Sequence, residues 1–369
     1  MLRMKTLLLA PLVALAFSGC GGAGQQAGDA SAANAAPPAP PAPPPPPPPP
    51  VTPPPGSQDF PTRCAQPGVL KCVGFDNAAD IPNVIGINSA NFGIFPASGN
   101  AAILPTLDTT VKASGASSLK FTVPANSGAD TSGSYFTNFS SDLSVQFGEN
   151  QVFYVQWRQR FTPEFITTPY SGGGGWKQII LGSGDQPGGT VYFSCTTLET
   201  VVNNNTYRGF PQMYNSCGGS SAPAFFPFEE AFGQNDYKLQ NARPIPYCLY
   251  SQRLTSFFSP VGNCFPYVAG EWMTFQMRIQ TGPRGGPLND VFTNSFVTLW
   301  MARERGASEL VFNWGPYSLA AGNPVENQKY GKVWLLPYNT GKDPSATYTP
   351  TATWYDELII SRNQIADPQ

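Results

Sequence analysis

The part of the chain after Phe60 alternates apolar and polar side chains with a period of two. In residues 151–161, Phe153, Val155 and Trp157 are apolar, whereas Gln156 and Arg158 fall on the opposite side. Because successive side chains of a strand point to opposite faces, this pattern predicts strands with one buried face. Similar runs occupy 119–123, 272–280, 297–301, 333–336 and 355–361. Strands at this density, separated by Gly, Pro and Asn, predict an all-β antiparallel sandwich.

The distribution of proline and aromatic residues divides the chain. Fifteen of the 40 prolines lie between Pro37 and Pro55, whereas the 310 residues from Phe60 onward hold 46 of the 47 aromatic residues. A proline run is extended and builds no core, so it acts as a stiff spacer. We therefore predict a signal peptide at 1–19, a disordered Ala/Gly/Pro-rich tether at 20–59 and a folded domain at 60–369.

The N-terminus has the features of an export signal. Arg3 and Lys5 precede an apolar run from Leu7 to Phe17 that is too short to cross a bilayer as a helix. The following Ser18-Gly19-Cys20 resembles the bacterial lipoprotein box. The resemblance implies a lipid on Cys20 that anchors the protein to the outer membrane of the cell envelope, on its periplasmic or surface face. An ordinary secretory signal is the alternative.

Charge and histidine content exclude several functions. Charged residues make up 12% of the chain and the net charge is -2, so no basic surface is available for nucleic acid. The chain has no histidine, which excludes imidazole ligands and Ser-His-Asp or Cys-His catalysis. No CxxC spacing suggests a metal site. The sequence assigns no cofactor and leaves calcium binding open.

Six cysteines remain if Cys20 carries the lipid, and an even number in an exported chain indicates disulfides. Six cysteines allow 15 pairings, of which pairing between neighbours is the simplest. The expected bonds are Cys64–Cys72, Cys195–Cys217 and Cys248–Cys264. Residues 195–264 lack the alternation seen elsewhere, so we interpret them as a long insertion held by disulfides.

Two motifs carry groups suited to chemistry. The glycine run before Lys177 lacks the Gly-Lys-Ser/Thr order of a phosphate loop, so we interpret it as a flexible loop that leads into a strand presenting Lys177 or Gln178. The segment 330–342 predicts a strand ending in a turn that gathers Tyr338, Asn339 and Lys342, although such a turn can be merely structural.

Four segments, 117–121, 153–158, 270–275 and 354–361, follow the order seen in concanavalin-like jelly rolls. Within that superfamily they resemble polysaccharide lyases of the alginate, glucuronan and heparin lyase type. The resemblance implies two antiparallel sheets, of which the concave one forms a sugar groove. Glycoside hydrolysis is disfavoured, because Asp356 and Glu357 are adjacent and should point to opposite sides of a strand.

The resemblance also implies roles for individual residues. In such lyases an amide or Arg neutralises the uronate carboxylate, and a Tyr removes the C5 proton and protonates the leaving oxygen. Here Tyr338 would be base and acid, Gln156 and Arg158 would neutralise, and Lys177 or Asn339 would assist. The polar strand faces suit a carbohydrate, although a solvated face is the alternative. The expected substrate-binding residues are Tyr154, Arg160, Gln178, Gln276, Arg278 and Lys342.

The sequence thus predicts a monomeric, lipid-anchored envelope protein that binds an acidic polysaccharide and cleaves it by β-elimination. Related enzymes often use a His, so this chain either uses the tyrosine variant or lacks the activity. A non-catalytic glycan-binding or adhesion lipoprotein is the alternative.

Overall fold

A computed structural model describes the folded part of the chain. The described residues are 56–87, 89–97, 102–126, 132–168, 170–189, 191, 198–205, 209–215, 240–245, 248–250, 260–322, 327–337 and 339–369. All described residues belong to one compact unit, Pro45–Gln369. The predicted signal peptide and Cys20 therefore lie outside the described residues, as do Tyr338, Cys195 and Cys217.

The first sheet has nine antiparallel strands. Its main order is β13-β14-β12-β6-β18-β4-β3, with β1 paired to β18 and β15 paired to β14. The bounds are β1 Val69–Val73, β3 Thr106–Asp108, β4 Ser118–Val123, β6 Val152–Phe161, β12 Met273–Gln280, β13 Arg284–Gly285, β14 Val291–Ala302, β15 Glu309–Ala320 and β18 Thr351–Ser361.

The second sheet has seven antiparallel strands. Its order is β2-β5-β16-β7-β8-β9, with β17 paired to β7. The bounds are β2 Phe92–Phe95, β5 Ser134–Asn138, β7 Tyr170–Ser183, β8 Glu199–Asn205, β9 Gln212–Asn215, β16 Tyr330–Leu335 and β17 Asn339–Lys342. A separate pair joins β10 (Leu249–Tyr250) to β11 (Pro260–Val261).

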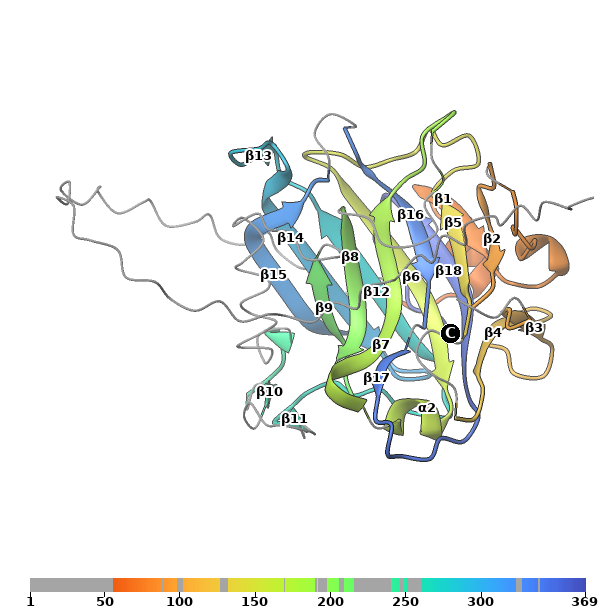
Figure 1. Ribbon diagram of the computed structural model, residues 1–369. Helices are drawn as coiled ribbons and strands as arrows, with labels where there is room; N and C mark the ends of the chain where they lie inside the picture. The colour runs from red at the N-terminus through yellow and green to blue at the C-terminus, as the bar shows by residue number, and fades with distance from the viewer. Residues whose placement is uncertain are drawn as a thin grey trace, which may run out of the picture. The chain divides into compact units, whose positions relative to one another are not determined.

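The two sheets stack face to face, and their inner sides form one hydrophobic core (Figure 1). Alternate residues of β6 and β12 enter it, as the sequence predicts. The rings of Trp157 and Phe275, on these two strands, stack with centroids 5.3 Å apart. Tyr135, Leu181 and Val333 enter the core from the other sheet. The predicted antiparallel β-sandwich with a jelly-roll fold is thereby confirmed.

Among the described residues, three short helices lie outside the sheets: α1 Phe60–Cys64, η1 Ala78–Asp80 and α2 Pro163–Thr167. The side chain of Asp59 caps α1 by accepting from the Thr62 amide at 2.8 Å, and Thr162 caps α2 by accepting from the Phe165 amide at 3.3 Å. Each cap satisfies a backbone donor that the helix leaves unpaired, which defines where these short helices begin.

Two predicted disulfides are confirmed. Cys64 bonds Cys72, with Cα atoms 6.0 Å apart, and ties α1 to β1. Cys248 bonds Cys264, with Cα atoms 4.4 Å apart.

Two local predictions are wrong. The glycine run before Lys177 is part of strand β7, which begins at Tyr170, and Asn339–Lys342 form β17 beside it instead of a turn. The two segments are far apart in the sequence but pair with each other, and this pairing satisfies their backbone hydrogen bonds. The turn-type residues within each segment give no indication of such a partner. The insertion 195–264 also supplies β8 and β9 to the sheet.

Candidate functional site

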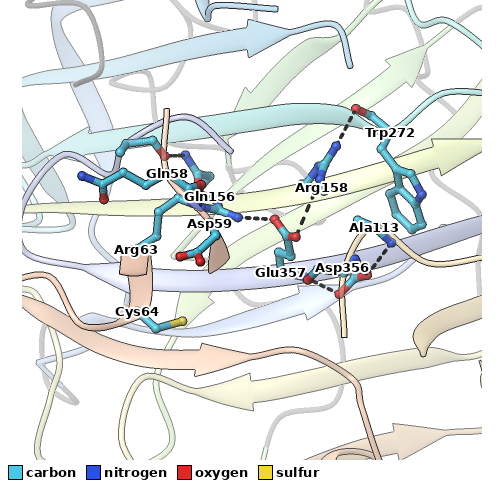
Figure 2. Close-up of polar contacts among 12 residues, drawn as sticks. Gln58, Asp59, Arg63, Cys64, Ala113, Gln156, Arg158, Trp272, Asp356 and Glu357 are labelled. Atoms are coloured by element: carbon cyan, nitrogen blue, oxygen red, sulfur yellow. Dashed lines mark hydrogen bonds and ion pairs between the residues drawn. The ribbon is translucent and has the colours of Figure 1, made fainter. Parts of the chain in front are cut away.

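Gln156 and Arg158 lie on the outer side of the nine-stranded sheet, in a buried network with the N-terminal segment (Figure 2). Arg63 of α1 donates to the Gln156 side-chain oxygen and forms an ion pair with Glu357 of β18. Arg158 lies 3.6 Å from the same Glu357 carboxylate and donates to the Trp272 carbonyl at 3.5 Å. Burial lowers the pKa of Arg63, and Glu357 opposes this shift. Both predicted neutralising groups therefore bind other parts of this chain.

The Asp356 and Glu357 side chains lie on the same side of β18, which contradicts the expectation that they diverge. In the pairing of β18 with β6, Asp356 lies opposite Arg158 and Ile359 lies opposite Gln156. Three residue steps on β18 therefore match two on β6, so β18 contains one extra residue. Glu357 adopts a φ of 50°, and this bulge returns its carboxylate to the outer side. Burial raises the pKa of Asp356 to about 8, although amides of Ala113 and Glu357 donate to it.

The C-terminal segment covers the same sheet. The Gln156 amide donates to the Ala366 carbonyl at 2.9 Å, and Gln276 donates to the Ile365 carbonyl at 2.9 Å. Gln276 also accepts from the Ile365 amide at 2.7 Å. Two of the glutamines predicted to hold a polysaccharide thus hold the end of this chain.

The other predicted residues of this sheet show varied surroundings. The half-buried ring of Tyr154 stacks on Trp300 with centroids 6.5 Å apart, and burial raises its pKa. Arg278 is buried and donates to Gln280. Arg160 is half-buried and lies opposite Trp354 of β18.

Gln178 and Lys177 belong to β7 of the other sheet. The Gln178 amide is buried between the sheets, where it donates to Gln159 at 2.8 Å and accepts from the Tyr267 hydroxyl at 3.1 Å. Lys177 is half-buried on the outer side, with its ammonium 5.9 Å from the centre of the Tyr214 ring. Of these two, only Lys177 lies on an outer surface.

The predicted residues on β17 lie next to β7. Asn339 pairs with Trp176, the residue before Lys177, and its side chain donates to the Pro337 carbonyl at 3.1 Å. Lys342 is half-buried beside the Tyr348 ring, 5.2 Å from its centre, and burial lowers its pKa to about 8. Thus the structure separates Gln156 and Arg158 on one sheet from Lys177 and Asn339 on the other. The catalytic roles of these residues stay predictions.

The outer side of the seven-stranded sheet carries a row of apolar and aromatic side chains flanked by two polar rows. We call this surface the three-row face. The register places the middle row directly across five strands, and its members form a hydrophobic cluster with Val84. This middle row consists of Phe136, Trp334, Ile180, Val201 and Tyr214. The first four of these side chains are buried, and Tyr214 at the end of the row is half-buried.

The first polar row contains a buried lysine and two carboxylates. The Lys332 ammonium forms an ion pair with Asp185 and lies 5.0 Å from the Phe136 ring centre and 5.3 Å from that of Trp334. Asn138 donates to the Asp185 carboxylate at 2.7 Å. Burial lowers the pKa of Lys332 to about 8, and Asp185 opposes this shift. Glu199 extends the row, because it lies opposite Gly182, which in turn lies opposite Lys332.

The second polar row consists of Lys177, Asn203 and Gln212, which lie opposite one another on β7, β8 and β9. It combines one ammonium with two amides, and its three positions carry no carboxylate. The two rows therefore differ in charge although they flank the same aromatic row.

The sequence analysis missed Lys332, Trp334 and Asn203. Because Val333 and Leu335 alternate with Lys332 and Trp334, the sequence pattern already indicates that Lys332 and Trp334 point away from the core. Asn203 begins an Asn run that we assigned to the insertion, and its place next to Lys177 depends on a pairing that local sequence does not show.

Within the described part of the chain, no three Cys, Asp or Glu side chains come together as a metal site. Among these same residues, no helix has the length and apolar character needed to cross a membrane.

No protein-family model matches the chain, and no curated protein is found as a relative. The chain is similar in structure to the marine PL-14 alginate lyase from Aplysia kurodai, with 10% identity and a TM-score of 0.47 over 79% of this chain and 98% of that chain. It is also similar to the endo-β-1,4-glucuronan lyase of the fungus Trichoderma reesei, with 14% identity and a TM-score of 0.40 over 74% and 94% of the two chains. An alginate lyase from a Chlorella virus gives 9% identity and a TM-score of 0.33 over 70% and 90%.

The expected resemblance to alginate and glucuronan lyases is confirmed. At these identities the likeness concerns the fold alone, and the substrates named for these enzymes are properties of those proteins.

Proposed function

We propose that this protein binds an acidic polysaccharide on the three-row face and cleaves it by β-elimination. We further propose that it does so while anchored to the cell envelope through a lipid on Cys20. The observation that carries the proposal is the second polar row, in which strand register places the half-buried ammonium of Lys177 opposite the amide of Asn203, and Asn203 opposite Gln212.

This row suits a uronate for electrostatic reasons. An ammonium attracts a carboxylate, and the neighbouring amides can exchange hydrogen bonds with hydroxyl groups. The half-buried side chains of Lys177 and Tyr214 make this edge of the face the accessible one. Lys177 takes the neutralising role that the sequence suggested for Gln156 and Arg158, because those two side chains bind Arg63, Glu357 and the C-terminal segment.

Neutralising the carboxylate has a direct chemical consequence. It makes the proton on C5 of the uronate more acidic, since the negative charge that develops upon its removal is stabilised. A base takes this proton, the C4–O4 bond breaks, and a C4–C5 double bond forms. The leaving O4 receives a proton from an acid. The products are an unsaturated uronate end and a new hydroxyl end, and no water is consumed.

Tyr338 remains our proposed base and acid. Support comes from its described neighbour Asn339, which pairs with Trp176 immediately before Lys177. A tyrosine acts as a base near neutral pH when nearby cations lower its pKa from about 10, and Lys177 and Lys342 on β7 and β17 are the cations to test.

The deciding experiment incubates the purified chain with polymannuronate, polyguluronate and polyglucuronate and follows the ultraviolet absorbance of unsaturated ends. We expect product with wild type, a loss of at least tenfold in kcat/KM with Lys177→Met, and no turnover but retained binding with Tyr338→Phe. Lys120→Met is the matched control, because Lys120 also lies on an aromatic ring, 5.4 Å from the Trp354 centre, but on the other sheet.

Each other outcome has a distinct meaning. Binding of a polyuronate without product would favour the non-catalytic glycan-binding alternative. New reducing ends without absorbance would mean hydrolysis. If no polyuronate binds or is cleaved, the proposed function is wrong.

A further inference from the structure

Strand β7 contains one extra residue at Gln178. In the pairing of β7 with β8, Lys177 lies opposite Asn203. The next paired residue, Ile179, lies opposite Val202, so two residue steps on β7 match one step on β8. Gln178 has no partner in this register. Such a bulge interrupts the ladder of backbone hydrogen bonds and changes the face of the sheet on which the flanking side chains lie.

The bulge determines the face on which Lys177 lies. Ile179 and Leu181 enter the core, so strict alternation counted back from them would turn Lys177 toward the core as well. Instead, Gln178 and Ile179 both lie on the inner side, and Lys177 is half-buried on the outer side beside Tyr214. Because a shift of one residue exchanges the two faces of a strand, the bulge is what places this ammonium outside the core.

Three side chains contact Gln178 from inside the sandwich. The Tyr355 hydroxyl, on β18 of the other sheet, donates to the Gln178 backbone carbonyl at 2.6 Å. Gln159 of β6 accepts from the Gln178 side-chain amide at 2.8 Å, and the Tyr267 hydroxyl donates to it at 3.1 Å. Tyr355 lies directly opposite Gln159 in the register of β18 and β6, so these two contacts come from one place on the nine-stranded sheet.

The contact from Tyr355 lies within the hydrophobic core. Tyr355 and Gln178 are fully buried, and the ring of Phe121 packs edge-on against that of Tyr355 with centroids 5.4 Å apart. Burial raises the pKa of Tyr355 well above its ordinary value, so the hydroxyl keeps the proton that it donates. A buried carbonyl without a donor costs free energy, and the bulge carbonyl would bear this cost without Tyr355.

We propose that Tyr355 and Gln178 are positioning residues, which hold the bulge of β7 and so keep the Lys177 ammonium on the outer side, where it neutralises the uronate carboxylate. Neither side chain contacts the polymer, since both lie between the sheets. This role rests on the proposed function, because Lys177 is the group that neutralises the carboxylate there.

The test combines Tyr355→Phe with Lys177→Met in the full chain. Tyr355→Phe keeps the ring against Phe121 and removes only the hydroxyl. We expect it to lower kcat/KM on polyuronate about three- to tenfold, the equivalent of one hydrogen bond, but less than about twofold in the Lys177→Met background. It should also change kcat and KM in the same proportion as Lys177→Met does, because it acts through that residue. Gln178→Met, which removes the side-chain contacts of the bulge, should act in the same direction.

Tyr330→Phe is the matched control. Tyr330 is also fully buried between the sheets, and its hydroxyl bonds that of Thr200 at 3.0 Å. It lies opposite Ser183, at the far end of β7 from the bulge. Both hydroxyl deletions should therefore lower the urea midpoint by similar amounts, whereas Tyr355→Phe alone should lower kcat/KM.

Equal losses of activity in Tyr355→Phe and Tyr330→Phe would overturn the inference, as would additive effects of Tyr355→Phe and Lys177→Met. In either case the proposed function would stand, since wild type still cleaves the polymer. If wild type binds a polyuronate without cleaving it, the salt dependence of binding replaces kcat/KM as the measured quantity. Tyr355→Phe should then reduce this dependence toward that of Lys177→Met, and an unchanged dependence would sink the inference. If wild type neither binds nor cleaves a polyuronate, both proposals fail.

Discussion

Replacing Arg63 with methionine tests the network that holds the N-terminal segment on the nine-stranded sheet. The Arg63 guanidinium is fully buried and meets Glu357, Gln156 and, at 3.2 Å, the Gln58 carbonyl. Methionine fills similar space but leaves the Glu357 carboxylate with Arg158, at 3.6 Å, as its remaining cation. Gln156 also loses a donor to its side-chain oxygen.

The expected cost follows from the charge left behind. Breaking a buried ion pair by removing one partner destabilises proteins by about 3–5 kcal/mol, because the remaining charge is uncompensated. Arg158 compensates part of it, so we expect the free energy of unfolding to fall by about 3 kcal/mol. The double variant Arg63→Met/Glu357→Gln removes the charge as well and should lose less than the two single variants added together.

Urea denaturation at pH 7, followed by tryptophan fluorescence, measures these differences. Arg303→Met is the control, because the Arg303–Glu271 pair is solvent-accessible, with the Arg303 side chain 51% exposed. Exposed pairs contribute up to about 1 kcal/mol. If Arg63→Met costs no more than Arg303→Met, or if the cycle shows no coupling, the network does not hold this segment in the way its contacts suggest.

Three other predictions concern stability and binding. Replacing Cys64 and Cys72 by alanine should lower the free energy of unfolding by about 2–3 kcal/mol, the effect of opening a loop of this length, and the urea midpoint will show it. Burial lowers the pKa of both Lys71 and Lys332 to about 8, so the unfolded chain holds more protons than the folded one between pH 8 and 10. Stability should therefore rise across that interval by about 1–2 kcal/mol per lysine, and Lys71→Met should flatten the rise; a fall with pH would contradict the assigned environments. Added salt should weaken polyuronate binding to the wild-type protein more than binding to Lys177→Met, because the variant lacks the cation of the second polar row. Equal salt dependence of the two proteins in a binding titration would argue against a role of Lys177 in binding the carboxylate.

The local pattern of the sequence was sufficient for the fold because strand formation and burial follow from alternation. Phe153, Val155 and Trp157 enter the core as their spacing requires, and neighbouring cysteines such as Cys64 and Cys72 are bonded. The same alternation placed Gln156 and Arg158 on the outer side correctly. The alternation could not show that the segment around Arg63 covers that outer side, because Arg63 is 93 residues from Gln156 and 294 from Glu357 in the sequence.

Predictions failed where long-range pairing decides local conformation. The glycine run before Lys177 and the segment Asn339–Lys342 look like loop and turn when each is taken alone, but they pair with one another as β7 and β17. The Asp356–Glu357 pair follows strand alternation until a bulge at Glu357, stabilised by contacts with Arg63 and Arg158, brings both carboxylates to one side.

The sequence by itself determined the sandwich and the absence of histidine chemistry, because periodicity and composition are properties of the chain alone. Only the tertiary structure decided which side chains share each outer face and what each of them contacts. The termini bind the outer side of the nine-stranded sheet, while strand register aligns Lys177, Asn203 and Trp334 on the outer side of the other. Such an alignment depends on contacts between residues far apart in sequence, which no local pattern encodes.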